Sequence, residues 1–252
     1  MQNYLDKIEK TYKNRVFFSE LDNSIFYNCK ADDFHENSSL FLENIEDLTN
    51  GLLEIKFECV DKNQESKIYI ARLKGKLNLK ASLSKTLIIL HSGFKGFWKI
   101  VALRNSIFQS GSILSAGEEN NPVSVFLDWF GTVFIGNNCL FSTGVTIQCG
   151  DGHSIIDLKE KKILNNKKSS IIISNYFWGG RNCNIMCSSK EINIGSGSIL
   201  GLASTLTKSI PKNCIYAGSP AKLIKENVSW TWSNIPSEKD IENVIKYLNF
   251  TS

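Results

Sequence analysis

His153 is the side chain best suited to catalysis in this 252-residue sequence. It lies in the glycine-rich segment 150–157, between the carboxylates of Asp151 and Asp157, and is one of three histidines in the chain. A neutral imidazole accepts a proton near pH 7, and a neighbouring carboxylate can orient its ring. We therefore predict that His153 is a general base and that either Asp151 or Asp157 positions it.

The element that must hold this segment is indicated by a repeat of six residues that begins at Ile135. Apolar residues or glycine open the units at positions 135, 141 and 147, at 173, 179 and 185, and at 194, 200 and 206. Strand-and-turn units of six residues, stacked coil on coil, form a triangular solenoid. Three separate blocks with one period are hard to obtain by chance, so we predict an all-β chain built on a parallel β-helix.

An interruption of the repeat, at residues 150–170, contains His153 and five lysines. The segment cannot continue the coil and must leave it as an extruded loop. Loops on a rigid scaffold are common places for function. The lysines either attract an anionic acceptor or form an ordinary solvated face.

The rest of the chain divides around this repeat. Residues 1–65 lack the period, and we expect an N-terminal cap there that is α/β or rich in strands. We assign residues 66–226 to the β-helix, with less regular strands before position 135. In the tail 227–252, Pro236 and Glu238 precede apolar residues at helical spacing, which predicts a C-terminal helix.

The order and spacing of these motifs resemble the hexapeptide-repeat acyltransferases. Within that family the sequence is similar to the branch of bacterial polysaccharide and sialic acid O-acetyltransferases. The resemblance covers about residues 135 to 228. It is carried by GDGHSIID (150–157), FWGG (177–180), LGLAS (200–204), TKSIP (207–211) and AGSPAK (217–222).

The resemblance implies a left-handed β-helix, a homotrimer with active sites between neighbours, and acetyl-CoA as co-substrate. It also implies that Trp178 lies beside the reacting groups, where an N–H can stabilise the oxyanion. Leu202 and Gly179 depart from the residue types usual in the family. The residues expected at the cofactor are Gly180, Arg181, Leu202 and Ala203 for the pantetheine arm, Thr207 and Lys208 for its continuation, and Lys222 and Lys225 for the phosphates.

The function that the resemblance implies is O-acetylation of a sugar hydroxyl in a bacterial surface polysaccharide, either a capsule or an O-antigen. Sialic acid is one candidate for the sugar that carries this hydroxyl. N-acetylation of a nucleotide-linked amino sugar is the alternative, because an amine also needs a base. A zinc carbonic anhydrase needs three imidazole ligands, and only His153 lies in the repeat, which disfavours that class of enzyme. A purely structural solenoid needs no base, and the Gly-Asp-Gly-His segment argues against it. An acetyl-enzyme on Cys187 is disfavoured by the lack of an adjacent base, so we expect direct transfer.

Composition excludes several other classes. A formal net charge of +4 suits a phosphorylated ligand but not a protein that coats nucleic acid. The first residues lack the apolar core of a signal peptide, and no segment reaches the roughly 20 apolar residues of a membrane span. We therefore expect a cytoplasmic protein. The seven cysteines lack the spacing of a zinc site, so we expect no metal.

Overall fold

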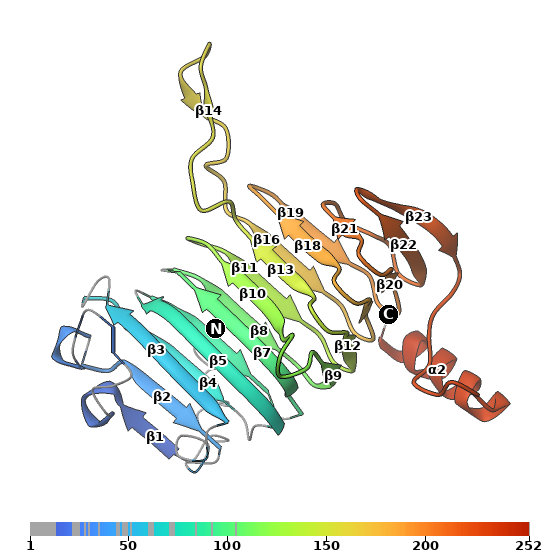
Figure 1. Ribbon diagram of the computed structural model, residues 1–252, viewed down its shortest axis with the longest axis horizontal. Helices are drawn as coiled ribbons and strands as arrows, with labels where there is room; N and C mark the ends of the chain where they lie inside the picture. Colours follow the sequence, from blue (N-terminus) through green and yellow to red (C-terminus); the bar gives the residue numbers. More distant parts are fainter. Residues whose placement is uncertain are drawn as a thin grey trace.

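The computed structural model is a β-solenoid in which three sheets run along one axis (Figure 1). It describes residues 14–21, 26–27, 29, 31–34, 36–43, 46, 50, 52–59, 63–70, 74–83, 85–91, 93–103 and 105–251. From β8 onward each coil passes through sheet A, then sheet C, then sheet B. Neighbouring coils pair in parallel, which confirms the predicted β-helix.

Sheet A has eight strands, sheet B seven and sheet C six. Sheet A contains β1 (Asn14–Phe17), β2 (Ser39–Leu42), β4 (Lys67–Ile70), β6 (Leu87–Leu90), β8 (Ile107–Ser110), β11 (Thr132–Ile135), β16 (Ser170–Ile173) and β19 (Glu191–Ile194). Sheet B contains β3 (Leu53–Cys59), β5 (Lys74–Leu83), β7 (Lys95–Ala102), β10 (Val123–Leu127), β13 (Thr146–Cys149), β18 (Asn184–Cys187) and β21 (Thr205–Leu206). Sheet C contains β9 (Ile113–Ala116), β12 (Cys139–Phe141), β17 (Trp178–Gly179), β20 (Ile199–Leu200), β22 (Cys214–Gly218) and β23 (Ala221–Glu226).

The six-residue repeat corresponds to columns of buried side chains inside the solenoid. Ile135, Ile173 and Ile194 occupy one register position of sheet A in successive coils, and all three are buried. The positions 141, 179 and 200 form the equivalent column in sheet C, and 147, 185 and 206 the column in sheet B. These columns stack each coil on the coils before and after it, and this contact is the main source of stability in a solenoid.

Gly179 occupies a column position where an aliphatic residue would be usual. A Cβ on Gly179 would lie 3.3 Å from Cε1 of Phe177 and 3.4 Å from Cδ1 of Phe141. The rings of Phe141 and Phe177 are 5.7 Å apart and fill the volume that a larger side chain at 179 would take. The glycine in this column is therefore compensated by the packing of two phenylalanine rings within the core.

Regular stacking begins inside the segment 1–65. There, β2 pairs in parallel with β4, and β3 pairs in parallel with β5. The described residues before β9 contain no strand of sheet C, and β5 and β7 are the longest strands. Two-stranded coils with long strands do not produce a six-residue period, which explains why the sequence pattern is weak before position 135.

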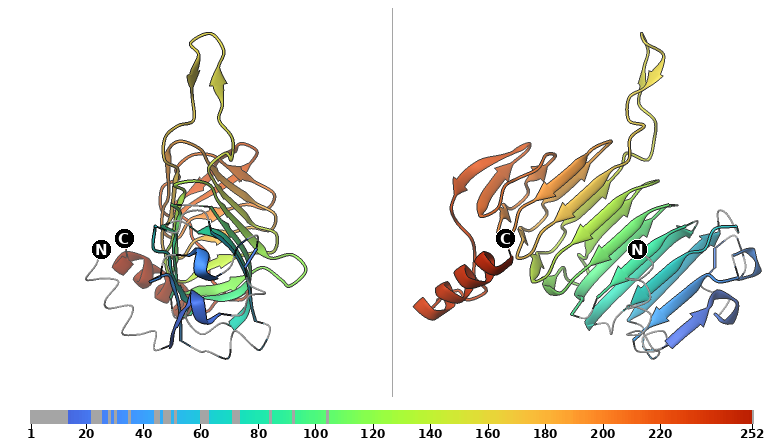
Figure 2. Two further views of the ribbon diagram at one scale, coloured as in Figure 1. Left: turned by 90° about the vertical axis from the view of Figure 1, so that its left-hand side faces the viewer. Right: turned by 180° about the vertical axis from the view of Figure 1, so that it is seen from behind.

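The chain adds length at the corners between sheets and keeps the strands in register. The longest addition follows β13 and carries the antiparallel pair β14 (Ile156–Asp157) and β15 (Lys162–Ile163), which projects from the solenoid (Figures 1 and 2). Shorter additions lie at residues 118–121, between β9 and β10, and at 188–190, between β18 and β19. The predicted extruded loop is therefore a hairpin on a stem.

The C-terminal end of the solenoid is closed by β22 and β23, which pair antiparallel. The helix α2 (Glu238–Thr251) begins after a reciprocal cap in which the Ser237 hydroxyl and the Asp240 carboxylate bond to each other's backbone N–H groups. Leu248 anchors this helix, because its side chain is buried beside Gly197. The 3-10 turns η1 (Phe18–Glu20) and η3 (Ala31–Asp33) complete the described elements, and none of the described helices has the length and apolarity to cross a membrane.

Candidate active site

The loop that carries His153 leaves the solenoid at the corner between sheets B and A. Gly150 makes this exit possible: its φ is +111°, and a Cβ there would lie 2.3 Å from Cβ of Asp128 in the preceding coil. One carboxylate oxygen of Asp128 accepts a hydrogen bond from the Trp129 backbone N–H at 2.8 Å, and the other accepts one from Gly152. Asp128 therefore fixes the base of the loop to the corner below it.

Asn165 ties the two sides of the loop together. Its side-chain N–H₂ donates to the Asp151 carboxylate at 2.7 Å and to the backbone carbonyl of His153 at 2.8 Å. Its side-chain oxygen accepts from the backbone N–H of Ile155 at 2.7 Å. Asp151 also accepts a hydrogen bond from the hydroxyl of Ser188 in the next coil. The backbone around His153 is thus held on both sides.

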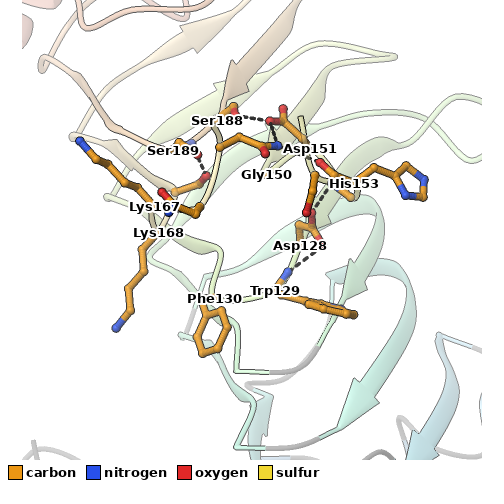
Figure 3. Close-up of a pocket in the computed structure, with 15 residues that line it drawn as sticks. Asp128, Trp129, Phe130, Gly150, Asp151, His153, Lys167, Lys168, Ser188 and Ser189 are labelled. Carbon is orange, nitrogen blue, oxygen red and sulfur yellow. Dashed lines mark hydrogen bonds between the residues drawn. The ribbon is translucent and has the colours of Figure 1, made fainter. Parts of the chain in front are cut away.

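The His153 side chain is exposed and extends beyond the carboxylates that anchor its loop. Among the described residues its ring nitrogens have no hydrogen-bond partner. Figure 3 shows the imidazole pointing away from Asp151 and Asp128. Within one chain, then, the ring is available to a ligand, and Asp151 acts on the loop backbone.

Asp157, the second carboxylate predicted to orient His153, lies out on the projecting hairpin. Its Oδ1 accepts hydrogen bonds from the backbone N–H groups of Lys159 at 2.9 Å and Glu160 at 2.8 Å. Two neighbouring amides on one carboxylate oxygen form an Asx-type turn. The single chain therefore uses Asp157 to shape the hairpin tip and does not bring it to His153.

A pocket of about 340 Å³ opens beside the loop, a size within the range of small-ligand sites. Its walls come from the corner after β10, from both arms of the loop and from the corner after β18 (Figure 3). The residues that line it include Trp129, Phe130, His153, Lys167, Lys168 and Ser189.

Trp178 lies on the outer face of sheet C. Its indole N–H points to the Ser142 hydroxyl at 3.4 Å, and its ring is 5.9 Å from that of Trp230 in the C-terminal tail. In a triangular coil, sheet C is opposite the corner between sheets B and A, where His153 leaves the solenoid. One chain therefore does not bring His153 and Trp178 together.

The residues predicted to hold the cofactor fall into two groups. Gly180 and Arg181 lie at the corner between sheets C and B, next to Leu202 and Ala203 of the following coil, and the Ala203 N–H donates to the Arg181 carbonyl at 2.9 Å. Gly180 is required for this approach, because a Cβ would be 2.8 Å from the Leu202 nitrogen. Lys222 lies near the same corner. It pairs with Ala217 in the β22–β23 ladder, and the N–H of the next residue, Gly218, donates to the Ser204 hydroxyl.

Thr207 and Lys208 lie at the other end of β21, at the corner between sheets B and A. This is the edge of the solenoid from which the His153 loop projects in an earlier coil. The ammonium of Lys190 donates to the Thr207 carbonyl at 2.6 Å, which links that corner to the equivalent corner of the preceding coil. Lys225 lies further along β23, opposite Ile215. The structure thus places the eight predicted cofactor residues along the last coils, but it divides them between the two ends of β21 and sets Lys225 apart on β23.

The thiols near the site are held in the protonated form. Burial raises the pKa of Cys187, whose thiol donates to the Lys190 carbonyl at 2.9 Å. Burial also raises the pKa of Cys149, its neighbour in the preceding coil, to about 12. A thiol needs a lowered pKa to act as a nucleophile, so this environment argues against an acetyl-enzyme. The described part of the chain contains no cluster of three metal-ligating side chains.

Sequence reasoning missed Asp128 and Asn165. Asp128 follows an ordinary repeat strand, and Asn165 lies among lysines. Neither belongs to a motif, and their roles depend on contacts 24 and 14 residues away along the chain. The interruption of the repeat at 150–170 was the one signal that a structured loop needed anchors.

Comparison with known proteins gives relatives for the region that carries the motifs. The chain is 46% identical over 98 residues to a polysialic acid O-acetyltransferase of Escherichia coli O1:K1 / APEC, covering 39% of this chain and 31% of that protein. It is 29% identical over 97 residues to a galactoside O-acetyltransferase of Lactococcus lactis subsp. lactis (strain IL1403), covering 38% and 44%. The alignments span less than half the length of these curated relatives, and no family model matches the chain.

Solved structures extend the likeness to most of the chain. The polySia-specific acetyltransferase NeuO has a TM-score of 0.65 and 29% identity, covering 77% of this chain and 91% of NeuO. The polysialic acid O-acetyltransferase OatWY has a TM-score of 0.61 and 20% identity, covering 79% and 95%. These likenesses confirm the left-handed parallel β-helix that the resemblance implied.

Proposed function

We propose that the chain is a hexapeptide-repeat acyltransferase that transfers an acetyl group from acetyl-CoA to a hydroxyl of a bacterial surface polysaccharide that contains sialic acid. The observation that carries this proposal is the position of His153, an exposed imidazole beside a pocket in an anchored loop. The similarity to a polysialic acid O-acetyltransferase supports the choice of acceptor. We place the reaction in the cytoplasm, where acetyl-CoA is made and used.

The chemical step is direct transfer. The neutral imidazole of His153 takes the proton of the sugar hydroxyl while that oxygen attacks the thioester carbonyl. A tetrahedral intermediate forms, and N–H donors near Trp178 stabilise its oxyanion. The intermediate then collapses, the C–S bond breaks, and the coenzyme A thiolate leaves and takes up the proton held by His153.

The active site in this proposal is built by two copies of the chain. His153 and Trp178 lie on opposite sides of one solenoid, as their sheets require. A cyclic trimer places the corner between sheets B and A of one copy against sheet C of the next, and each interface then contains one complete site. Homotrimer formation is therefore part of the mechanism.

The cofactor lies along the last coils in this arrangement. The corner of Gly180, Arg181, Leu202 and Ala203 supplies backbone groups for the pantetheine arm. Thr207 and Lys208 follow at the other end of β21, next to the corner that carries His153. The ammonium groups of Lys222 and Lys225 attract the phosphates, with the salt dependence expected of exposed charges.

The test is incubation of purified protein with labelled acetyl-CoA and a sialic acid polymer. We expect label on the polymer, and we expect His153→Ala to lower turnover by about 100- to 10,000-fold while coenzyme A binding stays intact. Label on the amine of a nucleotide-linked amino sugar instead would favour N-acetylation. A His153→Ala variant that kept more than about a tenth of the turnover would rule out the general base.

A further inference from the structure

The corner between β10 and β11 carries two exposed aromatic residues that neither the fold nor the chemical step explains. Trp129 is 56% exposed and Phe130 is 46% exposed. Phe130 has a φ of +62°, a backbone conformation that is rare and costly for a bulky side chain. The same corner position is occupied by Lys85, Asn105 and Ser189 in other coils, all with positive φ.

These aromatic residues face the candidate active site. Trp129 and Phe130 line the same pocket as His153 and lie on the wall opposite Asp151 and Ser188 (Figure 3). The pair is fixed in place, because Asp128 holds the Trp129 backbone on one side and the His153 loop on the other. Two aromatic residues at a position that is polar in other coils therefore coincide with the pocket.

Two ammonium groups of the pocket, unlike its carboxylates, have no polar partner among the described residues. The carboxylates of Asp128 and Asp151 already accept hydrogen bonds from backbone and side-chain donors. Lys167 and Lys168 also line the pocket, and neither forms an ion pair with any residue that the structure describes. The Lys168 ammonium lies 5.9 Å from the ring centroid of Phe130, so positive charge and aromatic surface adjoin.

We propose that Trp129 and Phe130 form the platform on which a ring of an acidic sugar stacks, and that Lys167 and Lys168 pair with its carboxylate. This assignment rests on the proposed function and names the residues that select its acceptor. One face of a sugar ring presents C–H groups, which pack well against the negative face of an aromatic ring. An ammonium group next to that platform favours a sugar with a carboxylate over a neutral one.

The experiment measures glycan binding without acetyl-CoA, so that no transfer occurs. The probes are a sialic acid oligomer and an uncharged maltooligosaccharide of equal length, studied by calorimetry. Trp129→Ala and Phe130→Ala should each weaken binding of the sialic acid oligomer by roughly tenfold, since each removes apolar surface that the bound sugar would cover. Lys168→Gln should reduce the preference for the charged oligomer and its sensitivity to salt.

Matched controls separate the site from general effects. Trp232→Ala removes a tryptophan of similar exposure from the C-terminal tail, and Lys239→Gln removes a lysine from α2. Both should bind the oligomer as the wild type does.

Three results would overturn the assignment: unchanged binding in the Trp129 and Phe130 variants, no binding of the oligomer by wild type, or a change of molecular mass in these variants. The last would mean that a second copy of the chain covers the platform. Wild-type protein that binds the oligomer but transfers no acetyl group would contradict the proposed function. It would not contradict the assignment of Trp129 and Phe130 as the sugar-binding platform.

Discussion

The proposed general base, His153, is positioned through its backbone. Asn165 bonds to the carbonyl of His153, to Asp151 and to the N–H of Ile155, so a single amide side chain sets the path of the loop. The imidazole itself has no such support within one chain. In the proposed mechanism, placement of the base therefore depends on Asn165 and on the neighbouring copy of the proposed trimer.

Asn165→Ala should lower turnover by about 10- to 100-fold, because a displaced base loses alignment with the acceptor hydroxyl. The Michaelis constant for acetyl-CoA should change little, since Asn165 has no hydrogen bond to any of the eight predicted cofactor residues. Steady-state kinetics with both substrates check this. Asn166→Ala is the matched control, because Asn166 lines the same pocket and has no hydrogen bond among the described contacts. Equal turnover in the two variants would contradict a positioning role for Asn165.

The sequence predicts single residues unevenly. The six-residue period identified the buried columns at Ile135, Ile173 and Ile194, because stacking repeats the same environment at each unit. It could not separate Asp151 from Asp157, since both flank His153 in sequence. Only the hairpin, which carries Asp157 away from the solenoid, distinguishes them.

At the scale of elements, the hairpin of β14 and β15 projects away from the described strands of the solenoid (Figures 1 and 2). An isolated two-stranded hairpin is marginally stable in water. Its strands and their flanks nevertheless carry exposed apolar side chains, among them Ile156 and Leu158, the second of which is 87% exposed. We infer that the hairpin packs on a neighbouring copy of the chain.

Replacing residues 156–163 with a short glycine-rich turn should weaken the proposed trimer, because it removes the inferred apolar contact while His153 and Asn165 stay in place. Light scattering over a range of protein concentrations measures the change, with dissociation expected at higher concentration than in wild type. A shortened protein that remains trimeric at every concentration and keeps full turnover would show that the hairpin has no such role.

The N-terminal elements could not be predicted from sequence in the same detail. Before β9 the coils use the long strands β5 (ten residues) and β7 (eight residues), which hide the period of six. Parallel pairing of β2 and β3 with later strands arises from contacts across whole coils, and no local motif marks it.

At the scale of the whole molecule, the separation of His153 and Trp178 gives a direct test of sites shared between copies. Mixed trimers formed from His153→Ala and Trp178→Ala chains contain some interfaces with both residues intact. Such mixtures should be more active than either variant alone. Separately purified variants combined without subunit exchange are the control. A mixture no more active than the mean of its parents would mean that both residues act from one chain, or that Trp178 has no catalytic role.

The additions at the corners have a consequence for how such a protein can diversify. Residues 118–121, 150–169 and 188–190 lengthen three turns, yet the strands on either side keep their register. Each coil contacts only its neighbours, so an insertion at a corner is not transmitted along the axis. Natural variation can therefore lengthen, shorten or recompose one corner while the strands on either side of it, and the other corners, stay as they are.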